Sequence, residues 1–122
     1  MEWCDMNYEE LCSKIFKIDP KVRFVAVFDN SVKQLAGGMS GGVKSHLPDS
    51  LTKLSIEQAF VRWDTRLKLV DWLGSPRYAF GEYEKIRRYT FYLGRGTILA
   101  ISTEKDLSID VLVNKVLKLL DK

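Results

Sequence analysis

The clearest structural signal in the chain lies in residues 24–38, which read FVAVFDNSVKQLAGG. Its first five residues, 24–28, form a short run rich in β-branched and aromatic side chains, which is typical of a central strand covered on both faces. The polar residues 29–31, which follow, are typical of a turn. The chain then returns from Gln34 as a second strand that is expected to reach Gly42. The sequence therefore predicts a hairpin in which the first strand is central to a sheet.

Glycine is unusually frequent in the second strand of this hairpin, at Gly37, Gly38, Gly41 and Gly42. Glycine weakens a strand and often marks a bulge or the close approach of another backbone. The run over residues 37–45 has some likeness to a phosphate loop, but a phosphate loop needs glycine directly before Lys-Ser and opens a helix, whereas Val43 intervenes here and Pro48 follows. We therefore expect no nucleotide site, and a looser anion site at Lys44, Ser45 and His46 stays open as an alternative.

Three segments show apolar residues at helical spacing after helix-capping residues. The first is expected to start with a capping box over residues 7–10, the second to run from a capping box over residues 55–58 to Leu73, and the third to start after Asp106 or Ser108. Between the second and the third, over residues 77–103, the apolar period changes to two, which predicts three antiparallel strands joined as a meander.

The predicted order is thus helix, two strands, helix, three strands, helix. The five strands would form one antiparallel sheet with the helices packed on its faces, which is an α+β fold. The chain has 122 residues and shows no linker or low-complexity segment. We expect a single domain over residues 7–122, preceded by a flexible tail over residues 1–6.

The second predicted helix carries an apolar face beyond the one that the core needs. At 100° per residue, Val61 and Trp72 fall opposite the core stripe, and Leu69 lies nearby. This pattern predicts a helix that is packed on two sides and so a second contact surface. Alternatively, Trp72 folds over a loop near the end of the helix.

The composition argues against catalysis. Hydrophobic residues make up 46% of the chain and charged residues 29%, which excludes intrinsic disorder. The two cysteines, Cys4 and Cys12, and the one histidine, His46, leave few of the side chains that metal and nucleophile chemistry uses. Cys12 lies among apolar residues at helical spacing and is expected to be buried. We predict no catalytic, cofactor or metal site, and a cytoplasmic protein with free thiols.

The charge is small overall but unevenly distributed. The net charge is +3, too mild to indicate a nucleic-acid-binding protein, yet residues 62–95 hold eight basic and four acidic residues (+4) and the rest of the chain is −1. A basic second half fits either an acidic partner or a solvated face. Residues 87–92 mix arginine with aromatic residues as RNA-binding strands do, but Tyr89, Phe91 and Leu93 share one face and are expected in the core. RNA binding is therefore the least favoured reading.

The order of elements resembles the Roadblock-type dynein light chains, within the profilin-like and longin-like group of small sandwiches. The resemblance is carried by residues 24–29, by residues 34–38 and by the long helix from Ser55, and it spans roughly residues 7–120. The chain is also similar to a group of short, uncharacterised archaeal proteins. Val32 departs from the family, whose members often have glycine in this hairpin, and the meander is more basic than the resemblance leads us to expect.

The resemblance implies a non-enzymatic homodimer whose sheet continues across the interface, with the second helices packed together. It also implies a role as regulator or adaptor for a small Ras-like GTPase or a motor complex. Separately, no apolar run approaches the roughly 20 residues that a membrane span needs, so we expect no membrane partner, and the mild net charge argues against a nucleic-acid partner. The candidate interface residues are Val61, Leu69, Trp72, Tyr78 and Phe80. The candidate contacts for a partner or an anion are Lys44, Ser45, His46, Arg87 and Arg88. The alternative is a sensor domain of the PAS or GAF kind, in which the glycine-rich strand and Tyr78, Phe80 and Tyr83 line a ligand pocket.

Overall fold

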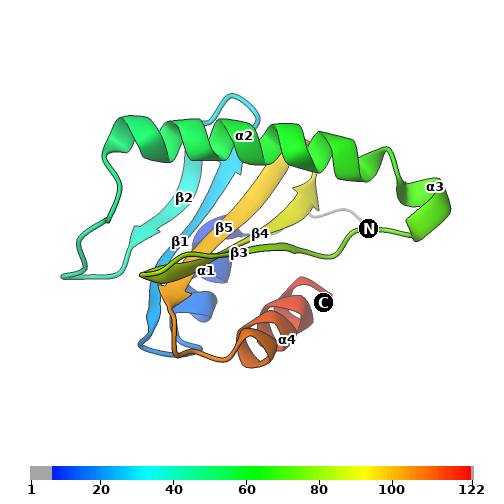
Figure 1. The fold of residues 1–122 in the computed structure, drawn as a ribbon. Helices are drawn as coiled ribbons and strands as arrows, with labels where there is room; N and C mark the ends of the chain where they lie inside the picture. Colours follow the sequence, from blue (N-terminus) through cyan, green and yellow to red (C-terminus); the bar gives the residue numbers. More distant parts are fainter. Residues whose placement is uncertain (1–6, 122) are drawn as a thin grey trace.

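A five-stranded sheet with helices on both faces makes up residues 7–121, the part of the chain that the computed structural model describes (Figure 1). The elements are α1 (Tyr8–Phe16), β1 (Val22–Asp29), β2 (Gln34–Met39), α2 (Asp49–Leu67), α3 (Val70–Leu73), β3 (Ala79–Glu82), β4 (Ile86–Gly94), β5 (Thr97–Glu104) and α4 (Ile109–Leu120). The predicted order and fold class are confirmed, with the short helix α3 in addition. The tail predicted over residues 1–6, which includes Cys4, lies outside the described residues.

The sheet is antiparallel throughout, in the order β2-β1-β5-β4-β3. β1 pairs with both β2 and β5, as expected of a central strand, and its residues Val25, Ala26 and Val27 are fully buried. The two edges are formed by β2 and β3. The strand that follows the long helix therefore presents one free side of its backbone to solvent.

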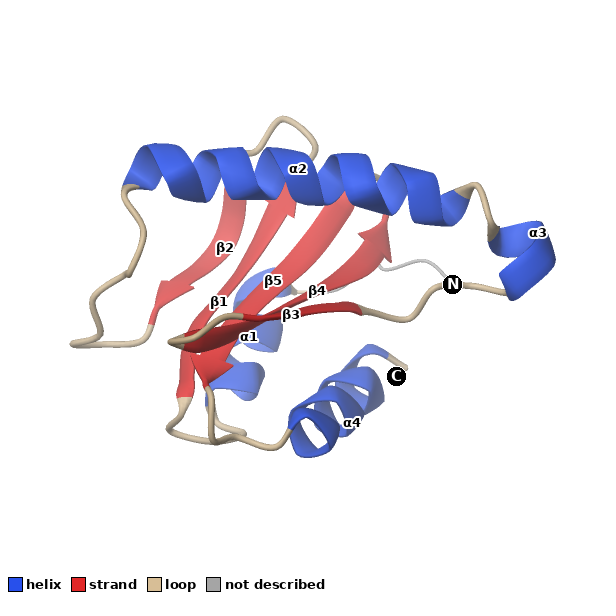
Figure 2. Cartoon of the chain, in the orientation of Figure 1, coloured by secondary structure: helices blue, strands red, loops and turns tan. Residues whose placement is uncertain are grey.

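Helices cover the two faces of the sheet unequally. α2 crosses one face, whereas α1 and α4 cover the other (Figure 2). Beneath α2, Trp63 is buried and its indole Nε1 donates a hydrogen bond of 2.8 Å to Thr90 Oγ1 on β4. On the opposite face, Tyr89, Phe91 and Leu93 of β4 join the core with α1 and α4, as their alternation predicted.

The start of α2 corrects the capping box expected at Ser55. The helix begins two turns earlier, at Asp49, because Pro48 has a φ of −59° that suits a helix start and Asp49 supplies a carboxylate to the first turn. Ser55 instead lies inside the helix, where its Oγ donates to the Thr52 carbonyl and accepts a bond of 2.9 Å from Arg88 Nη2.

The end of α2 corrects the prediction of one helix to Leu73. The backbone N–H groups of Lys68 and Leu69 bond to carbonyls three residues back, at 3.2 and 3.1 Å, instead of four. This tighter winding ends α2 and turns the chain into α3, which stops at Gly74 with a φ of +83°. α3 consequently extends past the edge of the sheet at one end of the molecule (Figure 1).

The glycine-rich strand ends sooner than expected, at Met39 instead of Gly42. Gly37 has a φ of +92°, and a Cβ atom there would lie 2.0 Å from the Val25 carbonyl oxygen on β1. The close backbone approach that the sequence predicted as one reason for these glycines is therefore found at Gly37. Gly41 and Gly42 belong to the loop that leads to α2, where a Cβ atom would meet nothing within 4 Å.

Candidate interaction surface

The outer face of α2 carries an apolar stripe, which we call the α2 stripe, formed by Leu51, Leu54 and Val61. These side chains are 47%, 49% and 58% exposed; Leu54 and Val61 lie opposite the buried residues of the same helix, such as Trp63, and Leu51 lies at the side of that face. The exposure of Val61 was expected. Leu51 and Leu54 were missed because the helix was predicted to begin at Ser55, although the Pro48-Asp49 pair signals the earlier start.

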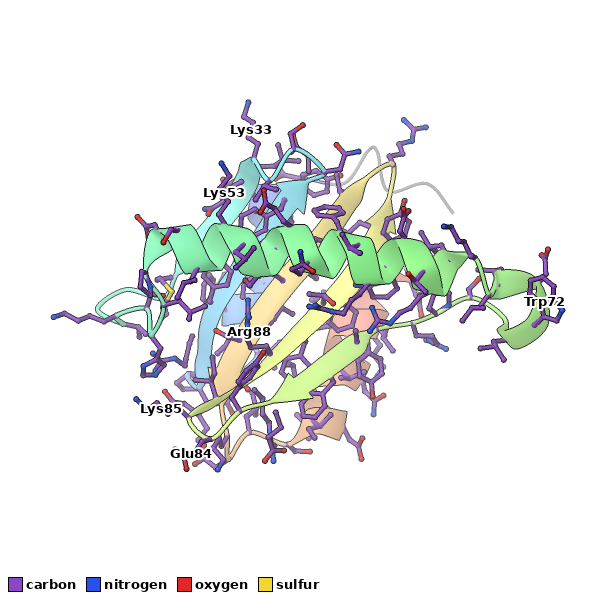
Figure 3. The ribbon with its side chains drawn as sticks, turned by 45° about the horizontal axis from the view of Figure 1, so that its top comes forward. Lys33, Lys53, Trp72, Glu84, Lys85 and Arg88 are labelled. Atoms are coloured by element: carbon purple, nitrogen blue, oxygen red, sulfur yellow. The ribbon has the colours of Figure 1, made fainter. Side chains whose placement is uncertain are left out.

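A second apolar feature, the α3 knob, consists of Leu69, Trp72 and Leu73. Trp72 and Leu73 are 78% and 77% exposed, which is rare for such large apolar side chains. Figure 3 shows Trp72 at the far end of the molecule from Glu84 and Lys85. The winding change after α2 thus moves Trp72 away from Val61, with which it was expected to share one helix face.

Tyr78 and Phe80, the remaining predicted interface residues, lie on the side of the sheet opposite α2. The Tyr78 ring stacks at 5.9 Å from that of Phe91, and the Phe80 ring lies 5.3 Å from that of Tyr89. Both remain partly exposed because β3 is an edge strand. The five predicted interface residues are therefore all exposed, but the structure places them in three separate regions.

The edge of β3 offers free backbone groups. The Tyr83 N–H donates to the Ile86 carbonyl, at 2.9 Å, inside the β3–β4 hairpin. Because bonded positions alternate along an antiparallel strand, Gly81 faces β4 in the same way, and the backbone groups of Phe80 and Glu82 face outward. A strand from another molecule can pair with these groups.

Between α2 and the strands β3 and β4 lies an open cavity of about 250 Å³ that holds three arginines. Arg62 and Arg66 reach it from α2 and Arg88 from β4, and no acidic side chain lines it. The Arg66 guanidinium carbon lies 5.2 Å from the centre of the Trp63 ring. The ion pairs Lys14–Glu10, Lys21–Asp106, Arg23–Glu104 and Arg87–Glu82 involve none of these arginines. The cavity is therefore the most basic hollow next to the β3 edge.

The residues predicted to contact a partner or an anion are only partly brought together. Ser45, His46 and Arg88 border a neighbouring cavity of about 230 Å³, together with Gly38 and Met39 of the glycine-rich strand. The Lys44 carbonyl accepts a hydrogen bond from Arg23, but Lys44 does not line this cavity. Arg87 lies on the opposite face, where its Nη1 donates to the Leu107 carbonyl at 2.9 Å and its Nε is 3.5 Å from Glu82.

An apolar hollow of about 490 Å³, here called the N-terminal pocket, opens where the start of α2 meets the β3–β4 hairpin. Leu47, Leu51 and Ile86 supply its apolar walls. The other lining residues are His46, Ser55, Tyr83, Glu84, Lys85 and Arg88. Sequence reasoning missed this pocket because its walls come from segments up to about forty residues apart.

The structure does not bring together the residues expected for the two alternative functions, a sensor domain and an RNA-binding module. Phe80 and Tyr83 both border the cavity that holds the three arginines, but Tyr78 does not, and the glycine-rich strand borders a different cavity, so the four features do not line one ligand pocket. Tyr89 and Phe91 are buried and cannot stack on bases.

The one cysteine that the structure describes is inert. Cys12 is buried in the core to which α1 and α4 both contribute, and burial, with a smaller effect of the Glu9 carboxylate, raises the pKa of its thiol from 9.0 to about 11. The thiol therefore stays protonated near neutral pH, when a nucleophile would need to be a thiolate. Within residues 7–121, no three His, Cys, Asp or Glu side chains gather into a metal site. No helix of the described chain is long and apolar enough to cross a bilayer.

Comparison with solved structures supports the fold expected from the sequence. The Roadblock/LC7 domain from Streptomyces avermitilis is similar with a TM-score of 0.67 and 14% identity, covering 93% of this chain and 91% of that one. The gliding protein MglB from Thermus thermophilus has a TM-score of 0.70 and 12% identity, covering 93% and 82%. Profilin II from Acanthamoeba castellanii has a TM-score of 0.58 and 14% identity, covering 94% of both chains. The chain has the Roadblock and profilin-like fold.

Sequence comparisons place the chain in a family. A search of curated proteins found no match. The resemblance to archaeal proteins accordingly stays a prediction. A family model, described as a family of unknown function (DUF6659), matches residues 2–122, so the chain belongs to the DUF6659 family.

Proposed function

We propose that this protein is a non-enzymatic homodimeric interaction module that regulates or scaffolds a small Ras-like GTPase. The observation that carries the dimer is the free β3 edge beside the α2 stripe. Two copies related by a two-fold axis can pair their β3 strands through the backbone groups of Phe80 and Glu82. This pairing extends the sheet and brings the two α2 helices next to each other.

The structural relatives support the same reading. One of them is MglB in a tetrameric arrangement, which shows that a protein of this fold can self-assemble. The GTPase partner follows from the resemblance to Roadblock-type proteins. The arginine-lined cavity beside β3 would favour an acidic surface on that partner.

The dimer is tested by the mass of the protein in solution, measured by light scattering at micromolar concentration. Glu82→Pro removes an outward N–H without breaking a bond to β4, so we expect it to yield a monomer. Glu82→Ala is the matched control, because it also removes the contact with Arg87 but keeps the N–H. A monomeric wild-type protein, or a dimeric Glu82→Pro variant, would show that β3 is not the interface.

The partner is tested separately by mixing the dimer with purified small GTPases from the same organism, loaded with GDP or with a GTP analogue. A complex that co-elutes in gel filtration supports the proposal. Absence of any complex would leave a dimer without a role in GTPase regulation.

A further inference from the structure

Two apolar features lie at opposite ends of α2 without an occupant in the same chain. The α3 knob, at the C-terminal end, exposes Trp72 and Leu73, and the N-terminal pocket, at the other end, is walled by Leu47, Leu51 and Ile86. Figure 3 places Trp72 and Lys85, a rim residue of the pocket, at opposite ends of the molecule. A chain therefore cannot fill its own pocket with its own knob.

A two-fold axis at the β3 edge brings these features together between two chains. β3 returns beneath α2 in the opposite direction (Figures 1 and 3). A strand that pairs with a copy of itself about a two-fold axis pairs antiparallel, and the helix that crosses the sheet on the face above that strand is inverted with it. The knob end of one α2 then lies beside the pocket end of the other.

We propose that the α3 knob of each protomer docks into the N-terminal pocket of its partner. This inference rests on the proposed β3 dimer and names the contact that completes it. Each chain carries both halves of the contact, so one two-fold axis covers two knobs and fills two pockets. A second copy of this chain is for that reason the occupant, in preference to an unrelated protein.

The spacing along α2 fits this docking. Arg62 and Gly81 border the same cavity, so the middle of β3 lies beside the C-terminal half of α2. Trp72 lies ten residues beyond Arg62, and Leu51 lies eleven residues before it. With a helical rise of about 1.5 Å per residue, Leu51 lies roughly 16 Å from Arg62 along α2, and Trp72 lies beyond the other end of that helix, in α3. An antiparallel copy therefore places Trp72 at the end of the dimer that holds the partner's pocket.

The chemistry of the two surfaces is also complementary. The pocket, at about 490 Å³, has room for an indole and a leucine side chain, and its walls are apolar. Its rim carries Lys85 and Arg88 against one carboxylate, Glu84, whereas the knob carries Asp71 between its apolar residues. An anchor of this kind, a tryptophan that enters an apolar pocket, is the usual centre of a protein interface.

The fluorescence of Trp72 tests the docking. Trp3→Phe leaves Trp72 and Trp63, and Trp63 is 1% exposed and bonded to Thr90, so quenching by acrylamide reports on Trp72. At concentrations where light scattering shows a dimer, we expect Trp72 to be protected, with a blue-shifted emission. Upon dilution to the monomer it becomes quenchable. Trp72→Ala should weaken dimerisation by about 30-fold, as truncating a central aromatic anchor does.

Two matched variants locate the docking site. Leu51 and Leu54 both belong to the α2 stripe and are equally exposed, but only Leu51 borders the pocket. In the dimer, Leu51→Gln should expose Trp72 and Leu54→Gln should not. If both variants expose Trp72 equally, or if Trp72 is quenchable in a wild-type dimer, the docking is wrong and the β3 dimer stands. If the protein is a monomer at every concentration, both proposals fail.

Discussion

Gly37 is a residue whose replacement should have a large effect for backbone reasons alone. Its φ of +92° disfavours an L side chain, and a Cβ atom would lie 2.0 Å from the Val25 carbonyl oxygen. We expect Gly37→Ala to lower the free energy of unfolding by about 2–4 kcal/mol in urea titrations. Gly41→Ala, in the following loop with open space around it, should change it by less than about 0.5 kcal/mol. Equal effects would contradict this account.

Cys12 should make stability depend on pH in the alkaline range. Burial raises the pKa of its thiol from 9.0 to about 11. Between these two values the unfolded chain loses the proton while the folded chain keeps it, so the free energy of unfolding falls as the pH rises. The Cys12→Ala variant has no thiol at this position and so lacks this pH-dependent contribution to the free energy of unfolding. The difference in unfolding free energy between the wild type and the variant, from urea titrations, should therefore be smaller at about pH 10 than at about pH 8. An unchanged difference would show that folding does not raise the pKa of the Cys12 thiol.

At the scale of elements, α1 depends on one cap. The Asn7 side chain accepts a bond of 3.0 Å from the Glu10 N–H, as the predicted capping box requires, whereas the Glu10 carboxylate turns to Lys14 at 3.7 Å and does not reach back. We expect Asn7→Ala to cost about 1 kcal/mol of unfolding free energy and Asn7→Asp to cost little, because aspartate also caps. A loss of similar size in both variants would mean that the loss does not come from the side-chain oxygen that caps the helix.

The elements differ in how far local sequence determines them. The meander was predictable because the alternation of Tyr89, Phe91 and Leu93 is a local pattern that matches the pleat. The start of α2 was not, since two helix-start signals compete and the one at Pro48 prevails over that at Ser55. The segment before Leu69, where α2 ends, contains neither glycine nor proline, so no residue type signals that end. The structure shows it as a change in hydrogen-bond spacing from four residues to three.

At the scale of the whole molecule, a dimer should couple stability to concentration. Because the native dimer is favoured by mass action, the midpoint of thermal unfolding should rise with protein concentration. Val61→Glu, on the α2 stripe, should reduce this dependence by weakening the dimer. Val111→Glu, at an exposed position on α4, should leave it unchanged. Calorimetry over a hundredfold range of concentration would check this, and midpoints independent of concentration would contradict the dimer.

The candidate site was less predictable than the fold because it is assembled across the sheet. Exposure of Val61, Leu69 and Trp72 followed from helical periodicity, which is local. The cavities around Arg88 required the packing of α2 over β4, which no spacing in the sequence reports. Arg87 and Arg88, adjacent in sequence, consequently act on opposite faces of the sheet.

The other edge of the sheet determines how far assembly can go. β2 has two consecutive residues with positive φ, Gly37 and Gly38, and the Gln34 side chain donates a bond of 2.9 Å to the Gly37 carbonyl. Such an edge presents no regular row of donors and acceptors to a further strand. Assembly by strand pairing therefore stops at the dimer, because only the β3 edge can accept a strand. A molecule with two such edges would instead add copies at both and polymerise into a fibre.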